Sequence, residues 1–160
     1  MNSLEIKRQN GNVPKSLPGQ DHVSGMIFYV NEADIPDGFK SQPVQAASVI
    51  DTAEALGITS DAKSWAIRVM HYQLSETFRL NNGITLYVGI FTKPQTHTFA
   101  ELSKVQNYAD GAIRQFGIWD GLTALTKENV TLLQSQAEAL DLNNAPVSVG
   151  YAPSLKSGYQ

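Results

Sequence analysis

The stretch AIRVMHYQLSETFRLNNGITLYVGIF, residues 66–91, decides the fold class of this chain. Its first part carries an apolar residue at every fourth position from Ala66 to Phe78, which predicts an amphipathic helix. The Asn-Asn-Gly turn at 81–83 tolerates left-handed backbone and ends that helix. The run Ile84–Phe91 that follows is apolar on both faces, as expected of a central strand in a parallel sheet.

The same order of helix and then strand recurs along the chain. Helices are predicted over Ala62–Leu80, Phe99–Ala109 and Lys127–Leu142, and each leads into a predicted strand: Ile84–Phe91, Ile113–Trp119 and Pro146–Tyr151. Two earlier apolar runs, Val23–Val30 and Val44–Ala47, predict further strands, and a short helix follows the second. This alternation predicts a layered α/β fold, with helices packed on a mostly parallel sheet.

Local signals place the helix ends. Ser48 is predicted to cap the short helix, and residues 59–61 to open the long one. Thr98 and Glu101 have the spacing of a capping box for the third helix. Thr126 is predicted to cap the fourth.

The two ends of the chain differ from the middle. Residues 1–20 are polar and interrupted by proline and glycine, so we expect an extended arm before an α/β domain at 21–152 and a polar tail at 153–160. The arm has a net charge of +2, whereas the other 140 residues carry nine basic and fourteen acidic groups, a net charge of −5. Such an arm could dock on an acidic neighbour or remain a solvated terminus.

Composition excludes several classes of protein. The chain has no cysteine, which excludes disulfides, thiolate metal sites and thiol catalysis. The net charge of −3 gives no reason to expect nucleic-acid binding. No apolar run approaches the ~20 residues that span a membrane, and the first ten residues lack an apolar signal core. We therefore expect a protein of the cytoplasm that does not insert into membranes.

The sequence contains no recognisable catalytic motif. The three histidines, His22, His71 and His97, are isolated; His71 is predicted to lie on the polar helix face and His97 in a turn. The glycine patterns of nucleotide-binding loops and the nucleophile elbow are absent. No catalytic residue, cofactor or metal ligand is predicted, and the chain is expected not to be an enzyme.

One alternative site remains open at the carboxyl ends of the predicted strands, where open parallel sheets bind ligands. Thr92, Lys93 and Asp120 stand at such ends and could hold a small polar ligand or a metal. The competing interpretation is that Asp120 and Gly121 form an ordinary turn. Trp65, Phe78 and Phe91 are predicted to be core residues.

The segment Val44–Tyr151 resembles the N-proximal α/β domain of bacteriophage contractile-tail sheath proteins, in particular sheath-like proteins of prophages in gut-dwelling bacteria. The resemblance rests on four pieces in order, the second being residues 66–91 above. The others are ASVIDTAEALG at 47–57, TFAELSKVQNYADGAIRQFGIWD at 98–120 and LLQSQAEALDLNNAPVSVGYAP at 132–153.

The resemblance implies a structural subunit that assembles with copies of itself into rings around a tail tube protein. Such a subunit is cytoplasmic during assembly and then part of a virion or another contractile particle. Terminal arms of sheath subunits add strands to neighbouring sheets, a role that residues 1–20 would take. Sheath proteins are usually longer and carry a C-terminal domain, so the resemblance also implies a fragment or a reduced relative.

Two other functions stay open from the sequence. One is a small-molecule-binding or enzymatic domain with its site near Thr92, Lys93 and Asp120. The other is a regulatory interaction domain that uses the helix face bearing Trp65 and Tyr72.

Overall fold

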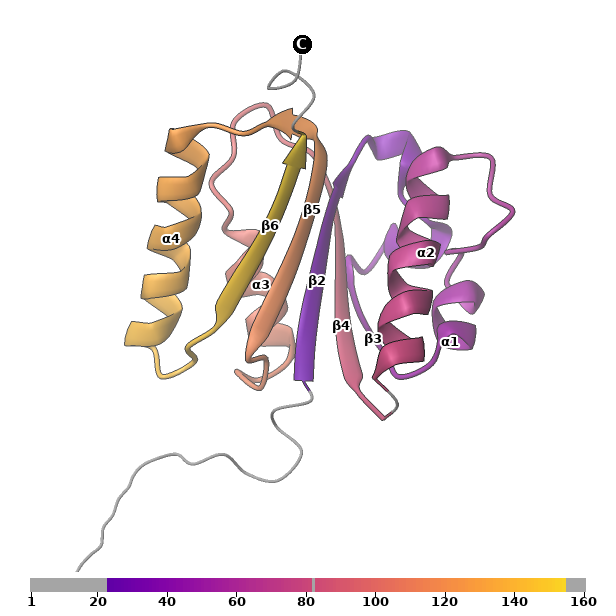
Figure 1. The fold of residues 1–160 in the computed structure, drawn as a ribbon, viewed down its shortest axis with the longest axis horizontal. Coiled ribbons are helices and arrows are strands. Elements are labelled where there is room, and N and C mark those ends of the chain that lie inside the picture. Colours follow the sequence, from indigo (N-terminus) through magenta and orange to yellow (C-terminus); the bar gives the residue numbers. More distant parts are fainter. Residues whose placement is uncertain (1–22, 82, 155–160) are drawn as a thin grey trace, which may run out of the picture.

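The computed structural model describes residues 23–81 and 83–154, which form an α/β fold (Figure 1). In chain order the strands and helices are β2 (Val23–Val30), β3 (Val44–Ala47), α1 (Ile50–Ala55), α2 (Trp65–Leu80), β4 (Thr85–Thr92), α3 (Glu101–Tyr108), β5 (Gln115–Ala124), α4 (Lys127–Leu142) and β6 (Ser148–Ser154). Two 3₁₀ turns, η2 (Glu32–Asp34) and η3 (Asp37–Phe39), follow β2. The predicted fold class is confirmed.

The five strands form one sheet in the order β3-β4-β2-β5-β6. β4, β2, β5 and β6 run parallel, and only β3 is antiparallel to its neighbour β4. The sequence did not show whether the predicted strand Val23–Val30 joins the main sheet. In the structure it is the central strand of that sheet. The central position explains why β2 is apolar on both faces, because its residues 27–30 are all completely buried.

The chain winds in two directions from the centre of this sheet. From β2 it passes through α2 to β4, crosses back through α3 to β5, and continues outward through α4 to β6. β2 and β5 therefore flank the point at which the winding reverses. In doubly wound sheets, ligands bind beyond the carboxyl ends of the strands at this position.

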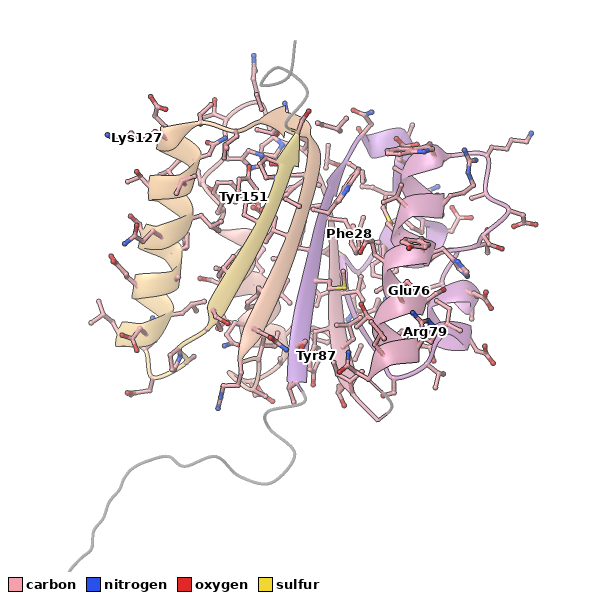
Figure 2. All side chains as sticks on the ribbon, viewed as in Figure 1. Phe28, Glu76, Arg79, Tyr87, Lys127 and Tyr151 are labelled. Atoms are coloured by element: carbon pink, nitrogen blue, oxygen red, sulfur yellow. The ribbon has the colours of Figure 1, made fainter. Side chains whose placement is uncertain are left out.

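Helices cover both faces of the sheet and create two cores (Figure 1). On one face α2 buries Met70, Leu74 and Phe78 against β2 and β4. On the other, α3 and α4 pack on Tyr29, Phe116 and neighbouring residues. Figure 2 shows the two directions, with Phe28 on the side of α2 and Tyr151 on the side of α4.

Three predicted helix starts are wrong. α2 begins at Trp65, because the Ser64 side chain accepts the hydrogen bond of the Ile67 amide at 3.3 Å. α1 has no side-chain cap from Ser48. Glu101 does not complete a capping box with Thr98, since its carboxylate accepts a 2.7 Å hydrogen bond from the Tyr29 hydroxyl instead. Tertiary contacts have overridden a local motif at this last position.

Other local predictions are confirmed or extended. Thr126 caps α4 by accepting from the Asn129 amide at 3.1 Å. β6 continues through Pro153 and Ser154, which were assigned to the polar tail. The predicted arm at 1–20 and the rest of the tail lie outside the described residues. Between residues 23 and 154, as far as they are described, no helix is both long and apolar enough to cross a bilayer.

Candidate functional site

Asp120 is the centre of a buried polar cluster rather than part of a turn. It lies within β5 and is completely buried. Its Oδ2 accepts a hydrogen bond from the Tyr151 hydroxyl at 3.1 Å and lies 2.8 Å from His97 Nε2. The turn prediction is wrong because β5 continues to Ala124, with an irregular pairing to β6 after Asp120.

His97 is the residue of this cluster whose role the sequence did not indicate. It is 4% exposed, and its Nε2 also lies 3.1 Å from Thr123 Oγ1. Its ring stacks on Phe99 with centroids 4.5 Å apart and meets Tyr29 edge-on at 4.7 Å. No local signal could reveal this, because His97 lies in a loop and its partner carboxylate, Asp120, stands far along the chain on β5.

Two tyrosines complete the cluster as neutral donors. Burial, and then the hydrogen bond to Glu101, raise the pKa of Tyr29 far above its ordinary value. Burial, and then the negative charge of Asp120, raise the pKa of Tyr151. Both phenols therefore stay protonated at neutral pH, and each donates a hydrogen bond to a carboxylate, Tyr29 to Glu101 and Tyr151 to Asp120.

The cluster is built to hold the fold together. Tyr151 belongs to β6, Asp120 to β5 and His97 to the loop before α3, so one carboxylate ties three segments. His97 Nδ1 and Asp120 Oδ1 form no hydrogen bond with any described residue, but both are buried. Neither of the two clefts described below is lined by them.

The structure does not bring the three residues of the alternative site together. Thr92 ends β4 opposite Val30, and the Lys93 amide continues this pairing by donating to the Val30 carbonyl at 2.8 Å. β2 lies between these residues and Asp120. Thr92 also follows Phe91, which shares a core with Tyr29, so the side chain of Thr92 points to the opposite face of the sheet. Among the described residues there is also no group of three potential metal ligands.

A small cleft lies at the reversal point of the sheet instead. It measures about 200 Å³ and is lined by Val30, Asn31, Asp34, Trp65, Ala66, Trp119, Gly121 and Leu122. Trp65 is 64% exposed, so its predicted place in the core is wrong, whereas Phe78 and Phe91 are buried as predicted. The ring centroids of Trp65 and Trp119 lie 6.3 Å apart, with the two ring planes tilted by 50°. We call this hollow the switch-point cleft.

The opposite border of the sheet has an open edge. β6 pairs with β5 on one side and with no described strand on the other. Its seven residues include no charged side chain. Beside it, α4 leaves Val130, Leu132 and Leu142 at 45%, 37% and 85% exposure. We call β6 and α4 together the β6 border.

One face of the sheet next to this edge is also uncovered. Of β5 and β6, only Trp119 packs against the α1–α2 core. A hollow of about 170 Å³ lies there between α2 and the small residues Gly117, Gly150 and Ala152. A side chain at Gly117 would meet no atom within 4 Å. The backbone of this part of the sheet is therefore open to another polypeptide.

Comparison with known proteins finds no similar protein. No protein-family profile matches the chain, and no curated protein or solved structure matches it. Functional inference therefore depends on the residues and their geometry.

Proposed function

We propose that this chain is a structural, non-enzymatic subunit of a phage or phage-derived contractile-tail sheath. In this role it assembles with copies of itself into rings around a tail tube protein. It does so in the cytoplasm and then becomes part of the virion or contractile particle. The proposal takes its kind of assembly from the sequence resemblance and its physical support from the β6 border.

The open edge of β6 is the observation that carries the proposal. Folded proteins usually protect an edge strand with lysines, prolines, bulges, inward-pointing charges, a covering loop or very short length. Among the described residues, β6 is seven residues long, has no charge and pairs with no strand on its outer side; its one proline, Pro153, stands next to its last residue and leaves residues 148–152 without such protection. Such an edge can accept an added strand from a neighbour, with main-chain hydrogen bonds supplying the contact.

The surroundings of this edge favour a protein partner over a small ligand. The exposed apolar residues of α4 and the uncovered glycines of the sheet lie on either side of it. Interfaces of lasting assemblies are enriched in apolar area of this kind. Asp120 and His97, a buried pair of titratable groups, line neither of the two clefts, and their contacts to Tyr151 and Thr123 are those of a pair that holds segments together.

Assembly can be tested by placing one charge on the edge. We expect the full chain to self-associate with rising concentration in light scattering, and rings or tubes to be visible by electron microscopy when the tube protein is supplied. Ala152→Lys places an ammonium group on an exposed position of β6 and should prevent association. Asn107→Lys, on the exposed side of α3, is the matched control and should assemble normally.

Two outcomes would count against the proposal. A wild-type chain that stays monomeric at all concentrations, with and without the tube protein, removes the assembly function. Equal assembly of the two lysine variants shows that the β6 edge has no part in it.

A further inference from the structure

The switch-point cleft has the position of a ligand site but not the chemistry of a nucleotide site. Its volume of about 200 Å³ is below the roughly 300–1,000 Å³ of clefts that enclose drug-sized ligands. A helix N-terminus at such a cleft ordinarily attracts phosphate. Here a carboxylate already lies beside the start of α2, because Asp34 Oδ1 accepts a 2.7 Å hydrogen bond from the capping residue Ser64. A second anion would be repelled.

The same groups suit a cation. Trp65 and Trp119 present two aromatic rings to the cleft, and tryptophan is the side chain that attracts cations most strongly through its ring face. Asp34 supplies a negative charge beside them. Neither Asp34 nor nearby Glu32 forms an ion pair with a described residue. A guanidinium or ammonium group on a slender stem fits both the charge and the size.

We propose that the switch-point cleft binds a basic side chain from residues 1–20 of this protein. That segment carries Lys7, Arg8 and Lys15 with a net charge of +2, against −5 for the rest of the chain. This inference goes beyond the proposed function and does not depend on it, because it rests on the cleft and the charge distribution alone.

The length of the segment allows this docking. β2 runs eight residues from Val23 to the cleft, a distance of about 26 Å at about 3.3 Å per residue. Arg8 stands fifteen residues before Val23, and a chain of that length extends up to about 50 Å. A basic side chain of the segment can therefore reach the carboxyl end of the sheet from its amino end.

The protein carries its own reporter for this test. It has two tryptophans, Trp65 and Trp119, and both line the cleft, so its tryptophan fluorescence reports on this site. The full chain with Lys7→Gln, Arg8→Gln and Lys15→Gln should be quenched more strongly by acrylamide than wild type, since the rings lose their cover. The matched control, Arg79→Gln, Lys104→Gln and Lys127→Gln, removes the same charges elsewhere and should behave as wild type.

Arginine amide then tests the chemistry of the cleft. In the triple variant of the segment it should shift the tryptophan emission saturably and restore protection from acrylamide. Asp34→Asn in that background should weaken its binding about fivefold, as expected for the loss of one exposed ion pair. Trp65→Ala removes a mostly exposed ring, so the fold should survive while binding is lost.

Two results would overturn the proposal. One is acrylamide quenching in the segment variant equal to that of wild type and of the matched control. The other is an arginine amide titration that leaves the emission of the segment variant unchanged.

Discussion

α2 and α4 have the same length, 16 residues, but they are packed very differently. α2 buries Met70, Leu74 and Phe78 against the sheet. α4 buries only Leu133 and Leu140, and its other large apolar residues remain exposed. Apolar residues at helical spacing therefore predict a helix in both cases, but not how much of that helix the chain itself can cover.

The difference follows from where the two helices lie in the sheet. α2 crosses the central strands β2 and β4, where partners surround it on several sides. α4 follows β5 and precedes the edge strand β6, whose own residues are only partly buried. α2 therefore buries a larger core than α4 does, although Trp65, Tyr72 and Leu80 of α2 also stay exposed. At the β6 border the exposed apolar residues of α4 lie beside an unpaired strand, where another chain can cover them.

The largest expected effect on stability is at the buried cluster of Asp120, His97 and Tyr151, which connects β5 to β6. Asp120→Ala leaves His97 and Tyr151 without their shared partner in the interior. Removing one member of a buried pair costs about 3–5 kcal/mol of unfolding free energy, measurable by urea denaturation. Asp141→Ala on exposed α4 should change stability by less than about 0.5 kcal/mol. A small effect at Asp120 would mean that the cluster does not hold β5 to β6.

Leucine truncations test the contrast between the helices directly. Leu74→Ala in α2 removes a completely buried side chain and should cost about 2–5 kcal/mol. Leu132→Ala in α4 truncates a side chain that is 37% exposed, so the monomer should lose less than about 1 kcal/mol. Chemical denaturation of both variants measures the two losses. Equal losses would contradict the comparison.

Alkaline pH should act on the α3–α4 side of the sheet through Tyr29. Its pKa is raised in the folded protein, so above pH 10 the unfolded chain releases a proton that the folded one keeps. The unfolding free energy is unaffected by Tyr29 below pH 10 and should fall above it, by up to about 1.4 kcal/mol per pH unit for this group. Urea denaturation between pH 8 and 11 measures this.

Tyr29→Phe provides the check on that slope. The variant has no phenol at this position and should lose less stability between pH 10 and 11 than wild type. Tyr87→Phe, in the same core, leaves Tyr29 and Tyr151 in place and should keep the wild-type slope. If Tyr29→Phe has the wild-type slope too, the alkaline loss comes from another group.

Helix caps give the smallest expected effects. Thr126→Ala removes the one side-chain cap of α4 and should cost about 1 kcal/mol. Ser64→Ala removes both a cap of α2 and the hydrogen bond to Asp34, so it should cost more than Thr126→Ala. Thermal denaturation of both variants compares them, and the reverse order would show that the bond to Asp34 adds nothing.

Much of the fold was predictable because its causes are local. Val23–Val30, Val44–Ala47 and Lys127–Leu142 were predicted with the bounds that the structure has. Errors arose where a distant partner competes with a local motif. Glu101 is the clearest case, because Tyr29 takes the carboxylate that the capping box required.

The sites were harder to predict than the fold, since each joins residues from separate segments. His97 and Asp120 each resemble turn residues in the sequence, and only the sheet brings them to 2.8 Å. Trp65 has the spacing of a core residue, but the cleft beside Trp119 leaves it mostly exposed. Periodicity does not tell which apolar positions a neighbour will cover.

By itself, the sequence determined the order of helices and strands, the mostly parallel sheet and the contrast between a basic first segment and an acidic remainder. These follow from periodicity, turn residues and charge, which act over a few residues. Only the tertiary structure decided that β2 is central, that Asp120 meets His97, and that β6 keeps an open edge. Those outcomes depend on which distant segments pack together, because burial and pairing are properties of the whole chain.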